Sequence, residues 1–225
     1  MSEAVRGSPG PHVFIDSLDV LQVAAGDLDH LAKSLRMRDG DPLTVSDGVG
    51  RWQHAEFSSD GSLKPAGEIV TVAEPSPDSQ STVAFSLTKS SKPEWVIQKL
   101  TELGVLNIVV LRSERTIVKW DDSKIDKATS RWKRIVREAA MQSHQVRLPT
   151  VTGVVPAIEW LARPDVAIAH FGGEVLTPLV RSIAIGPEGG WSDDEVDAAS
   201  MAISLGTSVL RAETAAVAAG VRLTL

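Results

Sequence analysis

The residues best suited to hold a ligand form a glycine- and proline-rich segment near the C-terminus, residues 183–192. An apolar run ends there in a loop whose glycines are Gly186, Gly189 and Gly190. Glycine has no Cβ, so such a loop can take positive φ and let a ligand lie against bare backbone. Ser192 stands three residues before Glu195, the spacing of a capping box. The segment therefore predicts a strand, a tight loop and a helix that points its free N–H groups toward the loop.

A second segment has the same form. Residues 203–206 predict a short strand, residues 207–211 a loop, and residues 213–221 an alanine-rich helix. Ligands of open α/β sheets lie at the carboxyl ends of the strands, so two such loops could form one cleft. Glycine-bearing loops are more often ordinary turns, and both interpretations stay open on this pattern alone.

The sequence lacks the residues that several kinds of functional site require. The chain has no cysteine, and its five histidines show no paired spacing, so we expect no metal site. Neither a phosphate-binding P-loop motif nor a Gly-x-Gly-x-x-Gly motif is present. Glycine loops without a basic residue suit a neutral or zwitterionic adenosine ligand better than a triphosphate.

Charge is unevenly distributed along the 225 residues. The net charge is −6, yet residues 112–137 hold nine basic and four acidic residues. This window fits a solvated helix face or a phosphate-binding face. No apolar run approaches the roughly 20 residues of a membrane span, and the polar first eleven residues lack a signal-peptide core, so we expect a cytoplasmic protein.

The order of predicted elements divides the chain. Residues 1–75 predict a small β domain with strands near 12–15, 43–45, 52–57 and 68–73 and a short helix or turn over 30–36. Residues 76–81 predict a linker. Residues 82–225 predict an α/β domain with a parallel sheet. Its further elements are strands at 82–87, 105–111, 150–155 and 165–169, a loop at 170–174, and helices at 93–103, 123–143 and 156–162.

The two C-terminal segments together resemble one family signature. They read Gly186-Pro187-Glu188-Gly189-Gly190-Trp191-Ser192 with Glu195, then Leu205-Gly206, then Leu210-Arg211-Ala212-Glu213-Thr214-Ala215. This is similar to the ribosomal RNA small subunit methyltransferase E family of the SPOUT (trefoil-knot) methyltransferases. Matching blocks upstream are Lys99 with Glu102-Leu103-Gly104, Ser113-Glu114-Arg115, Arg131-Trp132, Glu138-Ala139, Gln142-Ser143, Arg147 and Pro149. One position departs, because Gln145 stands where the family usually has arginine.

The resemblance implies a fold and an activity. We expect a PUA-like, RNA-binding β-barrel followed by a SPOUT domain with a C-terminal knot, assembled as a homodimer with the pockets at the interface. We expect methylation of N3 of a uridine in 16S rRNA, with S-adenosylmethionine as the cofactor and no metal or membrane partner.

The resemblance also implies site residues. The expected cofactor site comprises Gly172, Gly173, Ile185, Gly186, Pro187, Glu188, Gly189, Gly190, Leu205, Gly206, Val209, Leu210, Thr214 and Ala215. The expected RNA-binding residues are Arg36, Arg38, Arg112, Arg115, Lys119, Lys124, Arg131, Arg134 and Arg147. Arg211 would stabilise the uridine anion, unless it only pairs with Glu213. Glu188, Glu213 or a water could accept the N3 proton. Trp191 could stack on a base or belong to the core.

Three other functions remain open. A related SPOUT enzyme could act on another RNA or on a ribose 2′-hydroxyl. A non-catalytic ribosome-assembly factor could keep the fold, although it would not need Arg211 or the glycine loops. A different nucleotide-binding α/β protein is disfavoured by the missing phosphate loop.

Overall fold

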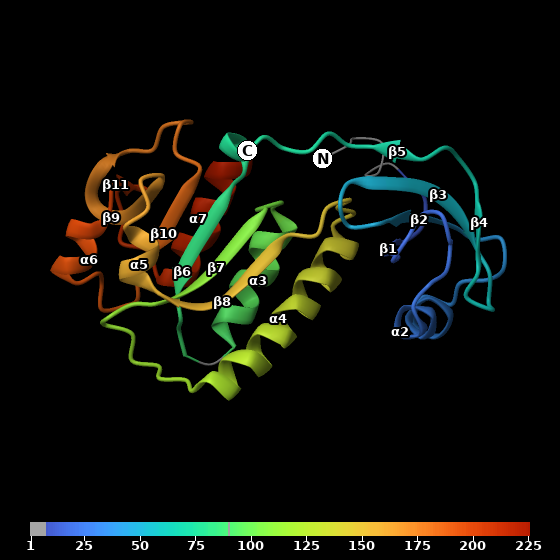
Figure 1. The fold of residues 1–225 in the computed structure, drawn as a ribbon, viewed down its shortest axis with the longest axis horizontal. Coiled ribbons are helices and arrows are strands. Elements are labelled where there is room, and N and C mark those ends of the chain that lie inside the picture. Colours follow the sequence, from blue (N-terminus) through green and yellow to red (C-terminus); the bar gives the residue numbers. More distant parts are fainter. Residues whose placement is uncertain (1–7, 90) are drawn as a thin grey trace. The chain divides into compact units, whose positions relative to one another are not determined.

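The computed structural model describes residues 8–89 and 91–225 (Figure 1). Residues 1–7 of the predicted barrel and Ser90, before the predicted helix at 93–103, lie outside the described residues. The chain forms two compact units. Unit 1 contains the described part of Met1–Glu74 together with Arg137–Leu148, and unit 2 contains Pro75–Val136 and Pro149–Leu225.

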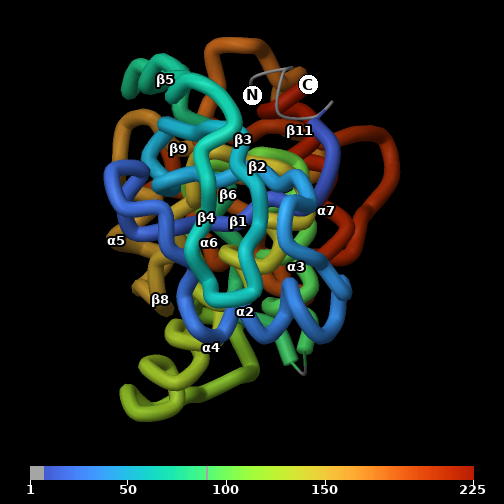
Figure 2. The backbone as a smooth tube through the Cα atoms, turned by 90° about the vertical axis from the view of Figure 1, so that its right-hand side faces the viewer, coloured from blue at the N-terminus to red at the C-terminus, as the bar shows by residue number. Residues whose placement is uncertain are grey.

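Unit 1 is built on a small mixed sheet. Its strands are β1 (His12–Phe14), β2 (Pro42–Ser46), β3 (Arg51–Phe57), β4 (Leu63–Pro65) and β5 (Val70–Thr71). They follow the order β1-β2-β3-β4, with β5 also on β3, and only β1 and β2 are parallel. Helix α2 (Ala25–Asp29) continues into the π-helix η1 (His30–Ser34) at one end of the strands (Figure 2). The sequence did not predict α2 or β4.

A later segment of the chain completes unit 1. The Ser46 hydroxyl donates to the Val146 carbonyl (2.8 Å), and the Gly50 N–H donates to the same carbonyl (3.1 Å). Trp52 and Val146 form a small buried cluster, and Met141 packs against the main core of the unit. Residues 137–148 therefore group with the N-terminal residues, although the sequence placed them within the second domain.

Unit 2 contains a six-stranded sheet in which all pairings are parallel, as expected from the alternation of strands and helices. The strands are β6 (Thr82–Ser86), β7 (Asn107–Arg112), β8 (Thr150–Pro156), β9 (Val166–Val175), β10 (Ser182–Ile185) and β11 (Met201–Ser204), in the order β11-β9-β10-β6-β7-β8. The helices are α3 (Lys92–Glu102), α4 (Asp122–Gln142), α5 (Ala157–Leu161), α6 (Asp193–Ala198) and α7 (Ala212–Thr224), with a 3-10 turn η2 (Pro77–Ser79) in the predicted linker. From Arg137 onward, α4 belongs to unit 1.

The two faces of this sheet bury two different cores, because successive side chains on a strand point to opposite faces. Val83 and Phe85 pack on one face with residues from α3, α4 and α7. Ala84 between them packs on the other face with residues from α5 and from the α6 region. Burial on both faces explains why β6, β7 and β10 are almost continuously apolar.

The pairing of β11 with β9, at one edge of this sheet, is irregular. The partner of Ala202 on β9 is Ile168, but the partner of Ile203 is Glu174, so five residues of β9 bulge out between them. The predicted loop at 170–174 is therefore part of β9, which is a correction. Gly173 permits the close approach, because a Cβ there would lie 2.7 Å from the backbone of Ile203.

No helix in the described ranges is long and apolar enough to cross a membrane.

Candidate functional site

The loop after β10 is held by its own tryptophan. Trp191 is 6 % exposed, and its Nε1 donates to the carbonyl of Ala169 on β9 (3.3 Å). A Cβ on Gly186 would lie only 3.1 Å from this indole, so the glycine lets the chain turn closely around the ring. Trp191 packs in the core between the sheet and α5 and α6. Of the two roles considered for Trp191, the structure supports the core role.

The loop ends in the predicted capping box. The Glu195 N–H donates to the Ser192 hydroxyl (3.4 Å), and the Ser192 N–H donates to Glu195 Oε2 (3.0 Å). Helix α6 thus begins where the sequence placed its start.

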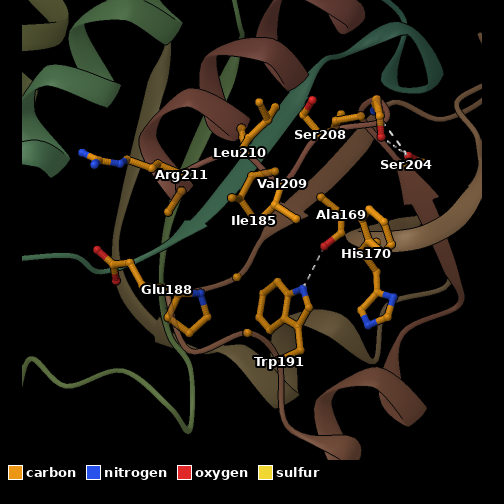
Figure 3. Close-up of a pocket in the computed structure, with 18 of the residues that line it drawn as sticks. Ala169, His170, Ile185, Glu188, Trp191, Ser204, Ser208, Val209, Leu210 and Arg211 are labelled. Atoms are coloured by element: carbon orange, nitrogen blue, oxygen red, sulfur yellow. Dashed lines mark hydrogen bonds between the residues drawn. The ribbon is translucent and has the colours of Figure 1, made fainter.

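A cavity of about 550 Å³ opens at the carboxyl edge of the sheet, between the loop after β10 and the loop after β11 (Figure 3). Eleven residues predicted for cofactor binding or catalysis line it: Ile185, Gly186, Pro187, Glu188, Gly190, Leu205, Gly206, Val209, Leu210, Arg211 and Ala215. Four predicted cofactor residues do not line it: Gly172, Gly173, Gly189 and Thr214. The two separate glycine loops thus share one cavity.

Sequence reasoning missed other lining residues, namely Ala169, His170, Phe171, Ser204, Ser208 and Ala212. Apart from His170, they are small or apolar residues whose type indicates no particular chemistry. His170 and Phe171 lie in the bulge of β9. This stretch was predicted from the sequence as a loop, and only its glycines, Gly172 and Gly173, were assigned to the cofactor site. Trp191 also contributes to the wall.

The mouth of the cavity carries both signs of charge. Lys92 Nζ, at the start of α3, lies 3.5 Å from Glu188 Oε1 and 3.2 Å from Glu213 Oε1. Arg211 precedes α7, and no residue in the described ranges pairs with its guanidinium. The possible Arg211–Glu213 ion pair is thus replaced by Lys92–Glu213. Arg211 and Glu188 lie on the same side of the cavity (Figure 3).

Glu213 is poorly suited to accept a proton. Its own backbone N–H, in the first turn of α7, donates to the carboxylate and lowers its pKa below the ordinary value. Hydrogen bonding and charge from Lys92, and the charge of Arg211, lower the pKa further against the opposing effect of burial. A carboxylate stabilised in its charged form is a weak base. Of the three predicted proton acceptors, the structure disfavours this one.

The Ser113-Glu114-Arg115 turn after β7 also reaches the cavity. Arg115, predicted to bind RNA, lines the cavity and donates from its guanidinium to the Gly189 carbonyl (3.3 Å). The turn is anchored on Glu195, which accepts from the Ser113 hydroxyl (2.9 Å) and from the Glu114 N–H (2.9 Å).

Most of the other predicted RNA-binding residues are exposed. Arg36, Arg38, Arg112, Lys119, Lys124, Arg131 and Arg134 belong to this group. Lys124 lies over the ring of Trp120, with Nζ 4.8 Å from the ring centroid. Arg131 pairs with Glu94 at 2.8 Å. The other residues of the group carry no ion pair within the described chain, so their charges face solvent.

Arg147 and Gln145 have structural surroundings in unit 1. The Arg147 guanidinium donates to the carbonyls of Val49 and Val72, the latter at 2.9 Å. Gln145 is 6 % exposed, so the position of the departure from the family pattern does not face solvent. These contacts account for Arg147 without an RNA contact.

The cavity fits the expected class of ligand. Its volume lies within the range of small-molecule sites, and its wall combines glycine backbone with the apolar side chains of Ile185, Leu205 and Leu210. Within residues 8–89 and 91–225, no cluster of histidine and carboxylate side chains could hold a metal ion.

Comparison with known proteins identifies similar chains. A family model described as an RNA methyltransferase domain matches residues 74–223. The ribosomal RNA small subunit methyltransferase E of Mycobacterium bovis is 34 % identical, covering 92 % of this chain and 88 % of that relative. The protein of the same name from Synechocystis is 32 % identical, covering 94 % and 74 %. A crystal structure of the Neisseria gonorrhoeae protein of this name, bound to S-adenosylmethionine, superimposes with a TM-score of 0.79 at 26 % identity, covering 95 % of this chain and 96 % of that one.

Proposed function

Because the chain belongs to the ribosomal RNA small subunit methyltransferase E family, we propose that it methylates N3 of a uridine in 16S rRNA, with S-adenosylmethionine as the methyl donor. The observation that carries the proposal is the cavity shared by the two glycine-bearing loops, with Arg211 at its mouth. The solved Neisseria gonorrhoeae relative is bound to S-adenosylmethionine, which supports the same cofactor here.

The cavity residues would hold the cofactor. Leu205, Gly206 and Leu210 offer backbone N–H and carbonyl groups and apolar surface to the adenosine. The opposite side is bounded by Gly186, Pro187, Glu188 and Gly190. When bound, S-adenosylmethionine supplies an electrophilic methyl group on a sulfonium. The chain orients the target base toward it and excludes water, since positioning and electrostatics are the contributions of a protein to such a transfer. Gly172, Gly173, Gly189 and Thr214 would act indirectly, because they do not line the cavity.

Arg211 is the proposed catalytic cation. A uridine must lose its N3 proton around the transfer, and the resulting negative charge spreads to O2 and O4. A guanidinium beside either oxygen would stabilise this charge. The Arg211 guanidinium is available for this role, because Lys92 rather than Arg211 pairs with Glu213. Glu188 at the cavity mouth, or a water molecule, would accept the proton.

The two units would have different roles in RNA binding and catalysis. Unit 1, which we propose to be the PUA-like barrel of the family, and the basic residues of 112–137 would hold the RNA backbone. The C-terminal segment of unit 2 would form the family's trefoil knot. We also propose a cytoplasmic location, where the ribosomal substrate is made. The proposed division into domains lies at the linker of residues 76–81, with residues 137–148 assigned to the first domain.

A homodimer with its interface near the cavity is the proposed assembly. Two residues that line the cavity, Phe171 and Val209, are 70 % and 85 % exposed, and Val175 and Leu179 follow Phe171 in the chain at 81 % and 92 %. Large exposed apolar side chains concentrated in this way are typical of an interaction surface. A second copy would cover them and complete the mouth of the cavity.

The test is methyl transfer from labelled S-adenosylmethionine to small subunits, and to naked 16S rRNA, from a strain that lacks the enzyme. Labelled 3-methyluridine after digestion supports the proposal. In Arg211→Ala we expect kcat to fall by about 10²–10³-fold, the usual loss when an oxyanion-stabilising group is removed, with cofactor binding retained. Arg222→Ala is the matched control, since Arg222 is an exposed arginine in α7, the helix that follows Arg211, and does not line the cavity.

Other outcomes would redirect the assignment. Label in a 2′-O-methyl nucleoside would indicate a ribose methyltransferase of the same fold. Tight cofactor binding without label in any RNA would indicate an assembly factor.

A further inference from the structure

Glu195 has more partners than a helix cap requires. It is 3 % exposed and forms no ion pair within residues 8–89 and 91–225, and its carboxylate accepts hydrogen bonds from three groups. Oε2 accepts from the Ser192 N–H (3.0 Å) and the Ser113 hydroxyl (2.9 Å), and Oε1 accepts from the Glu114 N–H (2.9 Å). The first of these contacts caps α6, whereas the other two reach a turn that follows a different strand, β7. A buried carboxylate without its hydrogen bonds would be costly, so these contacts fix the turn firmly.

The turn carries Arg115 to the cavity. Thr116 closes the turn, since its N–H donates to the Ser113 carbonyl (3.0 Å) and its hydroxyl accepts from the Ser113 N–H (3.2 Å). Arg115 lies against Gly189, because a Cβ on that glycine would be 3.5 Å from the Arg115 Cβ. One guanidinium nitrogen donates to the Gly189 carbonyl (3.3 Å), and within the described part of the chain the guanidinium has no further partner. Its remaining N–H groups are free to bind an incoming anion.

We propose that Glu195 is a positioning residue that holds Arg115 at the mouth of the cavity, where Arg115 binds the RNA backbone beside the target uridine. A planar guanidinium with free donors suits a phosphate oxygen. The carboxylate thus ties the phosphate-binding turn to the loop that bounds the cofactor cavity. The proposal rests on the proposed function, since it specifies how the same site receives its RNA.

The geometry selects Glu195→Gln as the test variant. Glutamine keeps the volume but has one acceptor oxygen, and the two carboxylate oxygens each accept from a backbone N–H. Whichever way the amide turns, its NH₂ must face one of these N–H groups. The orientation that keeps both the Ser192 and Ser113 contacts loses only the Glu114 contact, so the turn should loosen at Glu114 while the cap remains. Ser192→Ala is the matched control, because it removes the hydroxyl half of the cap and leaves both contacts to the turn.

The first measurement is amide hydrogen exchange at Glu114, which needs neither RNA nor cofactor. In Glu195→Gln we expect exchange of this amide to accelerate on the order of ten-fold or more, as a hydrogen bond to a buried charge is lost. In Ser192→Ala it should change much less. Unchanged exchange in Glu195→Gln would overturn the tether itself.

The second measurement is a double-mutant cycle on kcat/KM for the RNA, with the cofactor Kd measured separately. Glu195→Gln and Arg115→Ala should each lower kcat/KM about ten-fold, and the double variant should be no worse than Arg115→Ala, with cofactor Kd changed less than about two-fold. The proposed role through Arg115 would be overturned if the two losses in kcat/KM multiplied in the double variant. It would also be overturned if Ser192→Ala lowered kcat/KM as much as Glu195→Gln does.

If the wild-type protein methylates no RNA, the proposed function fails. The cycle is then repeated on the Kd for a fluorescent 16S rRNA fragment, where the same non-additivity is expected and additivity overturns the proposal.

Discussion

Replacing Gly173 by alanine tests how closely β9 and β11 must approach. A Cβ at Gly173 would lie 2.7 Å from both the N and the carbonyl C of Ile203 and 2.8 Å from the carbonyl C of Ala202. All three are backbone atoms, which cannot rotate away as a side chain can. The variant must therefore displace β11 or straighten the bulge in β9.

The expected loss of stability follows from these contacts. Overpacking of a close-packed site costs about 1–3 kcal/mol, and backbone clashes put this case near about 3 kcal/mol. For a protein of this size, that is a fall in Tm of about 6–12 °C. Because β11 leads directly into Leu205 and Gly206 of the cavity wall, the displacement should also weaken cofactor binding. A loss of about 1.4 kcal/mol in the free energy of cofactor binding would raise the cofactor Kd ten-fold.

Gly172→Ala is the control for this prediction. A Cβ at Gly172 would meet nothing within 4 Å, but the residue has φ of +82°, which favours glycine. The cost should be about 1–2 kcal/mol of backbone strain with no displaced strand. Differential scanning calorimetry and cofactor titration compare the two variants. A Gly173→Ala protein as stable as the wild type, or a Gly172→Ala protein that loses cofactor affinity equally, would refute the steric reasoning.

Two further predictions concern unit 1. Burial of His12, then repulsion from His144, lowers the His12 pKa from 6.5 to about 4, despite an opposing hydrogen bond to the backbone of Gln145. The folded state favours the neutral imidazole, so this contribution to stability is complete above pH 6.5 and falls by about 3 kcal/mol as pH drops to 4. Urea unfolding of the wild type and His12→Asn between pH 7 and 4.5 should show a shallower pH dependence in the variant, and parallel curves would contradict this. Arg147→Ala should destabilise unit 1 by about 2–3 kcal/mol, since the guanidinium's backbone contacts are lost. In a plot of the logarithm of the RNA-binding constant against the logarithm of salt concentration, Arg134→Ala should make the slope shallower by about 0.7–0.9, whereas Arg147→Ala should leave it unchanged. Equal changes in the two variants would show that Arg147 contacts phosphate.

Local patterns predicted much of unit 2. The apolar strands β6, β7 and β10 are evident because burial on both faces removes polar residues from them. The start of α6 was evident from Ser192 and Glu195 alone, since a capping box is a contact within one turn of helix. The joining of the loops after β10 and β11 in one cavity follows from the shared carboxyl edge of a parallel sheet.

Other features depend on contacts that the sequence does not encode locally. The second role of Glu195 joins it to Ser113, 82 residues earlier, and no spacing rule predicts that pair. The bulge in β9 was predicted as a loop because Gly172 and Gly173 are typical loop residues. In the structure, the missing Cβ of Gly173 allows β11 to pack closely against β9. Residues 137–148 were misplaced because the helical periodicity of α4 continues without a break, and periodicity does not reveal which core each half of a helix joins.

The composition of unit 1 from two distant stretches of chain has a consequence for biosynthesis. Its sheet is lined by Val146, and its turn at Gly48 accepts from the Leu148 N–H (2.9 Å), so the first 74 residues leave the ribosome without part of their own core. At about 5–20 residues per second, the missing segment follows on the order of 10 s later, and until then the β2 and β3 region is exposed to chaperones and proteases. A truncation after residue 75 therefore yields an incomplete unit, and a version that folds by itself would require residues 137–148 to be joined through a short connector.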